Sequence, residues 1–297
     1  MELQDRFQGC LIGLAVGDAI GTTLEFKHRG SFEPITDMVG GGPFFLKPGQ
    51  WTDDTSMAIC LAESLIDRKG FDAADQMDRY LQWWKQGKNS STGKCFDIGT
   101  TVANALHAYQ SSKKPFCGDT DPMSAGNGSL MRLAPVILFY YTAPDYYHYI
   151  MDSSRTTHSA PECLDACCYL GSLIKQILSG THRSELMRLD YTPKSKKVAR
   201  IANLDFLKKT KDQIKGSGYV IECLEAALWC FYKTDNFNDA VLLAANLGDD
   251  ADTTAAVCGQ IAGAYYGLSG IRGDWYKKLY ENERILSLAI NLYQNKA

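Results

Sequence analysis

Hydrophobic residues recur every three or four positions along most of the chain, whereas strict alternation of polar and apolar residues is scarce. The first pattern is typical of an amphipathic helix and the second of a half-buried strand. The helical pattern predicts the following helices: Phe7–Gly21, Thr55–Arg68, Ala73–Gln86, Thr101–Tyr109, Leu130–Tyr141, Pro161–Leu178, Val220–Tyr232, Phe237–Leu247 and Thr254–Tyr266. No β-α-β rhythm accompanies them. We therefore predict an all-α protein, one compact multi-helix domain over residues 1–297, whose loops carry the chemistry.

Glycine recurs at four-residue spacing in the first predicted helix and again in the last: Gly9, Gly13, Gly17 and Gly21, then Gly259, Gly263 and Gly267. This spacing lines one face of a helix and lets two backbones approach closely. Each glycine costs a helix about 1 kcal/mol relative to alanine, so a packing reason is expected. We predict that these two helices form a tight central pair.

Two clusters of acidic and hydroxyl residues each precede a run of small and apolar residues: Trp51-Thr52-Asp53-Asp54-Thr55 and Asp249-Asp250-Ala251-Asp252-Thr253-Thr254. Both therefore begin a helix, where unpaired N–H groups and the macrodipole favour negative charge. A helix cap uses one side chain, and the other carboxylates repel one another unless they are solvated or bound to a cation. Carboxylate and hydroxyl oxygens suit Mg²⁺ or Mn²⁺ rather than zinc. We predict one shared cation site, with the candidate ligands Thr52, Asp53, Asp54, Asp250, Asp252 and Thr253.

Composition narrows the class of protein. With 297 residues, of which 45% are hydrophobic, the chain can bury a sizeable core. Its net charge of −3 predicts no general affinity for nucleic acids or anionic membranes. Ten cysteines without a Cys-x-x-Cys motif indicate buried, reduced thiols. The apolar stretch Cys10–Gly17 is shorter than a membrane span and lacks a basic region before it. We expect a cytoplasmic protein that does not enter membranes.

Residues 183–215 differ from the rest of the chain because they carry an excess of lysine and arginine and no strong apolar stripe. We predict that they form a basic excursion on the surface. Such a segment is either simply solvated or a steering patch for an anionic substrate or partner.

Further residues are candidates for chemistry or binding, each with a structural alternative. Glu25, between Leu24 and Phe26, is either a general acid/base with a pKa tuned by its surroundings or a surface glutamate. Two glycine-containing loops either present N–H groups to a phosphate or are ordinary turns; they hold Gly99, Ser124, Gly126 and Asn127. His158 either packs against the start of the next helix or contacts a ligand. Tyr219 is either a core aromatic or a lid over a flat base.

The order of these motifs resembles that of the ADP-ribosylglycohydrolase family, which includes dinitrogenase reductase-activating glycohydrolase and the ADP-ribosyl-acceptor hydrolases. The matching motifs are Gly17-Asp18-Ala19 with Glu25, Trp51-Thr52-Asp53-Asp54-Thr55, Gly126-Asn127-Gly128 with Met131-Arg132, Thr157-His158, Gly218-Tyr219-Val220 and Asp250-x-Asp252-Thr253. Together they cover essentially the whole chain. One departure is that Asp249 stands where the family commonly has a second glycine, which adds a carboxylate beside the candidate ligands.

The resemblance implies a dinuclear Mg²⁺ or Mn²⁺ centre at the base of an ADP-ribose cleft. The six candidate ligands named above would surround two metals, with Glu25 beside them as an acid/base or metal-gating carboxylate. The diphosphate and ribose channel would be lined by Gly99, Ser124, Gly126 and His158, and Tyr219 would pack on adenine. The implied activity is metal-dependent hydrolysis of an ADP-ribosyl bond, so the partner is an ADP-ribosylated protein or an ADP-ribose derivative. We expect the protein to be a monomer.

Two other function classes compete with this interpretation. Isoprenoid synthases also bind metals through aspartates in an all-α fold, but their acids lie one helical turn apart. Asp53-Asp54 has no acid at position 57 or 58, and Asp250-x-Asp252 has the wrong period. The other class is a relative that binds ADP-ribose without catalysis. The presence of every candidate ligand and of Glu25 argues against this second class.

Arginine is the predicted acceptor, and serine-linked or another O-linked ADP-ribose is the alternative. The resemblance places Asp97 at the mouth of the cleft, near the scissile bond. A carboxylate there can pair with a guanidinium through two hydrogen bonds and can also orient the attacking water, so Asp97 is a second catalytic candidate. The structural alternative is that Asp97 caps the helix that follows it.

Overall fold

The computed structural model describes residues 1–186 and 189–297. In that part of the chain the fold is all-α, as predicted, and strand-like pairing is limited to isolated bridges. The α-helices are α1 (Leu3–Gly21), α2 (Asp53–Arg68), α3 (Ala73–Gln86), α4 (Thr100–Ser112), α5 (Ala134–Phe139), α6 (Tyr146–Arg155), α7 (Pro161–Leu178), α8 (Lys196–Ala202), α9 (Val220–Lys233), α10 (Phe237–Ala245), α11 (Ala251–Tyr266), α12 (Gly273–Lys278) and α13 (Asn282–Gln294). Short 3₁₀ helices are η1 (Thr22–Leu24), η2 (Pro122–Ser124), η3 (Arg183–Glu185), η4 (Asp205–Lys208), η5 (Lys211–Gln213) and η6 (Leu268–Gly270).

Every predicted helix is present, with bounds that differ by up to four residues in all but one case. The segment predicted as Leu130–Tyr141 is helical only over α5, because Pro135 lies in its first turn and proline is tolerated only there. Residues 128–132 form turns instead, which leaves the backbone of this loop free to line a cleft. Helices α6, α8, α12 and α13 were not predicted.

The basic segment 183–215 packs on the core as well as covering the surface. Residues 187–188 lie outside the described residues. In the remainder, Val198, Ile201 and Phe206 are buried in the main hydrophobic core. Ser195 caps α8 by accepting a hydrogen bond from the N–H of Val198. The segment is therefore a structured cover rather than a solvated loop.

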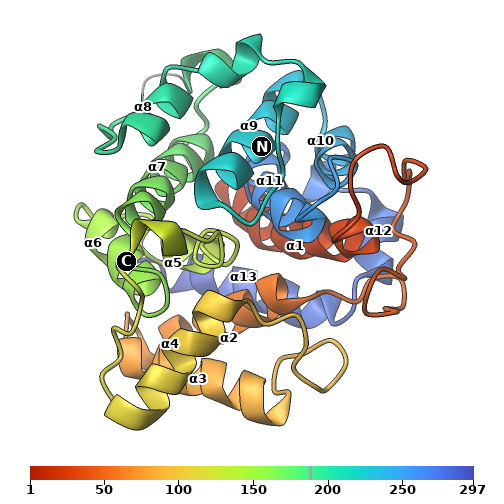
Figure 1. The fold of residues 1–297 in the computed structure, drawn as a ribbon. Helices are drawn as coiled ribbons and strands as arrows, with labels where there is room; N and C mark the ends of the chain where they lie inside the picture. The colour runs from red at the N-terminus through yellow and green to blue at the C-terminus, as the bar shows by residue number, and fades with distance from the viewer. Residues whose placement is uncertain (187–188) are drawn as a thin grey trace.

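Helices α1 and α11 form the predicted central pair and lie side by side in the middle of the molecule (Figure 1). A β-carbon on Gly13 would lie 2.3 Å from the carbonyl oxygen of Gly259. A β-carbon on Gly259 would in turn lie 2.0 Å from the carbonyl oxygen of Gly13. Since no side chain fits between the two backbones, glycine is required at these contacts.

Alanine in place of Gly13 should destabilise the fold by about 1–3 kcal/mol or more, because an added methyl group must push the two helices apart. Chemical denaturation measures this loss. Gly273→Ala is the matched control, since a β-carbon there meets no heavy atom within 4 Å. Equal stability of the two variants would contradict the close approach of α1 and α11.

The burial of α1 also bears on membrane association. Among the described residues, the segment Leu3–Leu24 is long and apolar enough to cross a membrane, but 94% of its apolar window is buried inside the fold. That burial is typical of the core helix of a globular protein. All ten cysteines are free thiols, and those other than Cys95 and Cys117 are buried, as predicted.

The cleft lies between the central helix pair and a smaller unit. Helices α2, α3 and α4 pack on one another through a hydrophobic cluster that includes Met57, Tyr80, Trp83 and Leu106. The N-terminal ends of α2, α4 and α11 all line one cleft between this cluster and the α1–α11 pair. Three helix starts therefore meet at one place.

Candidate active site

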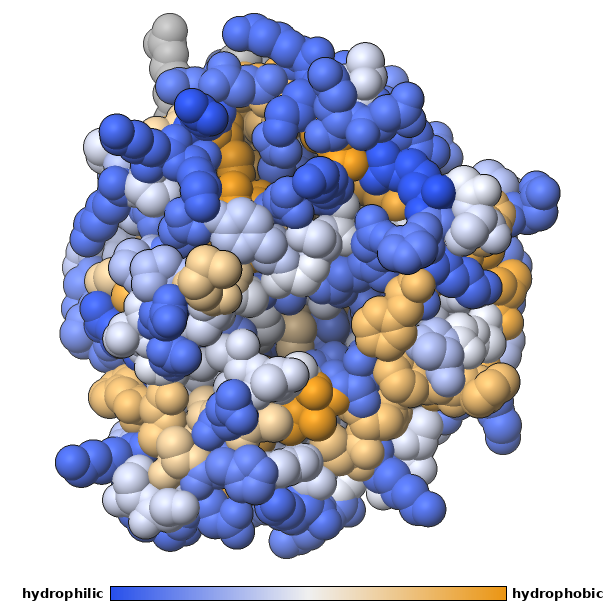
Figure 2. Space-filling view, in the orientation of Figure 1, coloured by the Kyte–Doolittle hydropathy of each residue, from blue (hydrophilic) through white to orange (hydrophobic). Residues whose placement is uncertain are grey.

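A cleft of about 330 Å³ holds most of the candidate residues. Figure 2 shows it as a hollow near the middle of this face, with both hydrophilic and hydrophobic residues along its edge. It is lined by Glu25, Phe26, Asp53, Asp97, Ile98, Gly99, Thr100, Thr101, Val102, Gly126, Asn127, Gly128, Met131, His158, Gly218, Asp250, Asp252 and Thr253. Among the described residues, the lining includes neither lysine nor arginine, so no cationic side chain of this lining neutralises the acids.

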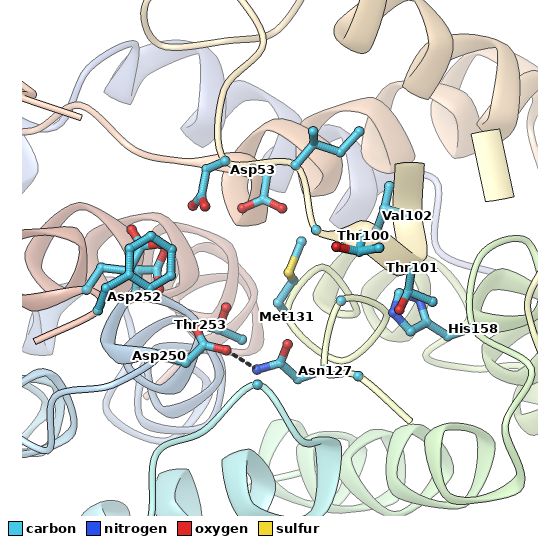
Figure 3. A pocket seen from close by; sticks show the side chains of 18 residues that line it. Asp53, Thr100, Thr101, Val102, Asn127, Met131, His158, Asp250, Asp252 and Thr253 are labelled. Carbon is cyan, nitrogen blue, oxygen red and sulfur yellow. Dashed lines mark hydrogen bonds between the residues drawn. The ribbon is translucent and has the colours of Figure 1, made fainter. Parts of the chain in front are cut away.

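The starts of α2 and α11 meet as the sequence predicts. The Thr52 hydroxyl lies 3.2 Å from Asp252 Oδ2 and 3.4 Å from Asp54 Oδ2. The Thr253 hydroxyl lies 3.4 Å from Asp54 Oδ2. Thr52 and Asp54 are fully buried, so they lie behind the cleft wall rather than along it. Asp250 accepts a hydrogen bond from Asn127 Nδ2 at 2.8 Å, which connects the second acidic cluster to a glycine loop (Figure 3).

Asp18 on α1 fixes the start of α2. One of its carboxylate oxygens accepts hydrogen bonds from the N–H and the hydroxyl of Thr52, at 2.8 and 2.9 Å. The other accepts from the N–H and the hydroxyl of Thr55, at 3.0 and 2.6 Å. Burial raises the pKa of Asp18 to about 6, although each of these four hydrogen bonds lowers it. Asp18 was not among the predicted site residues.

The carboxylates gather in two groups that share Asp252. Oxygens of Glu25, Asp97 and Asp252 lie within 4.8 Å of one another, and so do those of Asp53, Asp54 and Asp252. Asp54 Oδ1, Asp252 Oδ1 and Glu25 Oε2 are buried and find no hydrogen-bond donor among the described residues. Buried carboxylate oxygens without donors are costly unless a proton or a cation neutralises them.

Electrostatics also favours a cation here. Burial, followed by the charges of neighbouring carboxylates, raises the pKa of Asp53, Asp54 and Asp252 well above the usual range. Carboxylates this close cannot all be ionised without compensating positive charge. Since the donors are hard oxygens from carboxylate and hydroxyl groups, the group fits Mg²⁺ or Mn²⁺.

Glu25 and Asp97 both line the cleft beside Asp252, and the structural alternatives for both are wrong. Glu25 is 3% exposed rather than a surface residue. Burial, then the charge of Asp97, raises its pKa to about 10. Asp97 does not cap α4, because Gly99 occupies the N-cap position. It instead has a left-handed backbone, with φ of 58°, and burial raises its pKa to about 7.

The opposite end of the cleft is built from glycine loops and His158. Gly126 pairs with Tyr219 through an isolated bridge, and the N–H of Asn127 donates to Gly218 O at 3.0 Å. His158 is 2% exposed and lies at the end away from Asp53 and Asp252 (Figure 3). Gly99 also lines the cleft.

Two of the predicted binding residues do not line this cleft. The Ser124 hydroxyl donates to Asp121 O at 2.7 Å. Tyr219 is half-buried and follows Gly218, which does line the cleft. The Tyr219 hydroxyl contacts Glu162 and accepts a hydrogen bond from Lys197 at 2.6 Å. Lys197 belongs to the basic segment, so that segment reaches one of the candidate binding residues.

Comparison with known proteins identifies the family. The family model described as ADP-ribosylglycohydrolase matches residues 1–297. The chain belongs to the ADP-ribosylglycohydrolase family. It is 47% identical over 293 residues to "ADP-ribosylarginine hydrolase Tri1" of Serratia proteamaculans (strain 568), covering 98% of this chain and 80% of the relative. It is 33% identical to "ADP-ribosyl-[dinitrogen reductase] glycohydrolase" of Rhodospirillum rubrum, covering 94% and 91%. A solved structure titled "ADP-ribosylglycohydrolase-related protein complex" matches with a TM-score of 0.89 and 42% identity, covering 100% and 99%.

The departure from this ADP-ribosylglycohydrolase pattern at Asp249 is accommodated locally. Asp249 has a φ of 57°, the left-handed conformation that favours glycine. Its N–H donates to Lys27 O and its carbonyl accepts from the N–H of Phe26, which ties the Glu25 loop to the start of α11. The Asp249 carboxylate lies 3.2 Å from the exposed His28 ring, outside the cleft lining. The extra carboxylate is therefore not part of the acidic groups.

Proposed function

We propose that this ADP-ribosylglycohydrolase hydrolyses the N-glycosidic bond between ADP-ribose and an arginine side chain and requires two divalent cations, Mg²⁺ or Mn²⁺. The proposal rests on two clusters of three carboxylates that share Asp252. Among the described residues, the lining of their cleft contains no lysine or arginine. The names of the relatives from Serratia proteamaculans and Rhodospirillum rubrum support the activity.

The proposed metal ligands are the residues at the two helix starts: Thr52, Asp53, Asp54, Asp250, Asp252 and Thr253. Among them, Asp54 and Asp252 each have a buried carboxylate oxygen without a hydrogen-bond donor, and a bound cation would neutralise its charge. Bound divalent cations would act as a template and Lewis acid for the ribose hydroxyls and for water. Asp18 would hold the start of α2 in place through Thr52 and Thr55.

We assign proton transfer to Glu25 and orientation of the acceptor to Asp97. Breaking the bond at the anomeric carbon requires a proton for the leaving guanidine and removal of a proton from the attacking water. Glu25 is buried next to Asp97 and Asp252, so it is placed to hold and move a proton at that position. Asp97 is half-buried and lines the cleft, and we place the acceptor beside it.

The other end of the cleft is the proposed site of the diphosphate and adenosine. The N–H of Gly128 and the Gly99 backbone would face the diphosphate, together with Asn127 and His158. Tyr219 would contact the adenosine, and so would Ser124, which lies two residues before Gly126 in the sequence. A cytoplasmic location and an ADP-ribosylated protein as partner are consistent with the free thiols and with the relatives' names.

A panel of arginine-linked and serine-linked ADP-ribosyl substrates, assayed with each metal and after chelation, tests the proposed function. Release of ADP-ribose from arginine only, dependent on Mg²⁺ or Mn²⁺, is the expected result. Efficient cleavage of the serine linkage without arginine activity would overturn the acceptor assignment. ADP-ribose binding without turnover on any substrate would instead favour a non-catalytic relative.

Asp97→Asn should weaken hydrolysis of arginine-linked ADP-ribose far more than that of any serine-linked substrate. The carboxylate can pair with a guanidinium through two charged hydrogen bonds, whereas the amide loses the charge. Comparing kcat/KM for the two linkages measures the effect. Asp121→Asn is a matched control, because Asp121 is an exposed aspartate in another loop outside the cleft lining. An equal loss on both linkages would assign Asp97 a role that does not depend on the acceptor.

A further inference from the structure

A buried arginine lies beneath the glycine-loop end of the cleft. Arg132 is 1% exposed, and its guanidinium donates to Gly128 O at 2.8 Å and to the Thr157 hydroxyl at 2.7 Å. Longer bonds reach Ser153 O and the Thr156 hydroxyl, both at 3.3 Å. Within residues 1–186 and 189–297, no carboxylate forms an ion pair with it. Its charge is therefore hydrogen-bonded but not neutralised inside the fold.

The Thr157 hydroxyl connects this arginine to His158. Its oxygen lies 2.8 Å from His158 Nδ1, and Thr157 is fully buried. A guanidinium only donates, so the oxygen accepts from Arg132 and keeps its single proton for another partner. Among the described residues, His158 Nδ1 is the remaining hydrogen-bond partner of that hydroxyl. The arrangement that uses this proton has the hydroxyl donating to Nδ1, which places the imidazole's own proton on Nε2.

The Nε2 edge of His158 faces the glycine loop and the cleft (Figure 3). A β-carbon on Gly128 would lie 2.8 Å from His158 Cε1 and 3.2 Å from Nε2, and one on Gly126 would lie 3.4 Å from Nε2. This edge of the ring thus packs against two residues that have no side chain. Burial, followed by the charge of Arg132, lowers the pKa of His158 to about 3, which keeps the ring neutral.

We propose that Arg132 and Thr157 are positioning residues that hold His158 in the Nε2–H tautomer, as a neutral hydrogen-bond donor to an anionic oxygen of the ligand. On the proposed function, on which this inference rests, that oxygen belongs to the diphosphate of ADP-ribose. The uncompensated charge of Arg132 favours an anion at this end, while the carboxylates at the other end favour a cation. One cleft therefore has two ends of opposite electrostatic preference.

The tautomer can be tested without any ligand. In wild-type protein labelled with ¹⁵N-histidine, NMR should show one imidazole protonated only at Nε2, with signals that stay constant between about pH 5 and 8. The exposed His28, His107, His148 and His182 serve as internal references, and His158→Asn identifies the signal. A signal for the Nδ1–H tautomer, or for an imidazolium, at position 158 would overturn the inference.

The consequence for binding is tested with ADP-ribose and ADP by calorimetry. Thr157→Val keeps the shape but removes the hydroxyl, so affinity should fall about tenfold or more and the NMR signal should become that of mixed tautomers. Thr157→Ser restores the hydroxyl and should bind within about twofold of wild type. Thr156→Val is the matched control, because Thr156 is an equally buried threonine that accepts from Arg132 without touching His158.

Unchanged affinity in Thr157→Val, or an equal loss in Thr156→Val, would overturn the positioning role. If Thr157→Val does not fold, Thr157→Ser and the wild-type NMR spectrum still decide the tautomer. If wild-type protein fails to bind ADP-ribose at all, the proposed function is wrong. The NMR spectrum then still tests the hydrogen-bond assignment on its own, because a His158 signal from the Nε2–H tautomer would support that assignment without any ligand.

Discussion

Alanine in place of Asp252 is expected to abolish hydrolysis of arginine-linked ADP-ribose while the protein keeps its helical fold. Asp252 belongs to both groups of carboxylates, so its loss removes a candidate ligand from each. It lies in the first turn of α11, and its side chain faces the cleft rather than the hydrophobic core. Chelation of divalent cations should have the same effect on wild-type protein, and added Mg²⁺ or Mn²⁺ should restore activity only in the wild type.

The stability of the metal-free protein should change with pH in a defined direction. Folding raises the pKa of Glu25 from 4.5 to about 10 and that of Asp97 from 3.8 to about 7. A group with a raised pKa contributes its full stability below its unfolded value and loses it as pH rises through the folded value. The melting temperature of the metal-free protein should therefore fall between about pH 4 and pH 10. Saturating cation should raise it most at the alkaline end.

Differential scanning calorimetry and the hydrolysis assay check both expectations on the same samples. Asp239→Ala is the matched control, because Asp239 is an exposed acid in the first turn of α10, away from the cleft. It should retain wild-type activity and metal response. Full activity of wild-type protein after exhaustive chelation would contradict the metal-dependent reading.

Glutamine in place of Glu25 should lower kcat by roughly 10²–10⁴-fold, the usual contribution of a general acid or base. Glutamine keeps the shape and hydrogen-bonding capacity of the side chain but cannot exchange a proton. The affinity for ADP-ribose should stay within about tenfold of wild type, since Glu25 acts on the proton rather than on binding. The pH dependence of kcat should also lose the limb that titration of Glu25 produces.

Single-turnover kinetics and calorimetry separate rate from affinity in this variant. Glu33→Gln provides the control, because Glu33 is an exposed glutamate in the loop that follows Glu25. Affinity that falls as far as the rate would make Glu25 a binding or metal residue instead of the acid/base.

The sequence predicted the parts of the site that depend on local pattern. Both acidic clusters begin helices as their sequence indicates, and the glycine faces of α1 and α11 bring them together. The resemblance to the family added the order of the motifs. Local pattern was sufficient here because helix starts and four-residue glycine spacing each have one simple geometric meaning.

Residues whose role depends on distant contacts could not be predicted in this way. Asp18 lies inside an apolar helix, and only the fold brings Thr52 and Thr55 to its carboxylate. The environment of Glu25 remained open because the carboxylates beside it, Asp97 and Asp252, are far away in the chain. Helix α8 was missed since its buried Val198 and Ile201 are isolated among basic residues.

The pairing of α1 with α11 has a consequence for the order in which the protein is made. Arg6 in α1 donates a hydrogen bond to the carbonyl oxygen of Ala264, 258 residues later in the sequence. At 5–20 residues per second, a ribosome needs roughly ten to fifty seconds to synthesise that interval. During this time a highly apolar helix with four glycines on one face lacks α11, the helix that its glycine face packs against. The apolar helix of the nascent chain is thus prone to aggregation until the C-terminal quarter has been synthesised. We expect a chaperone that binds residues 3–24 to protect the chain over that interval.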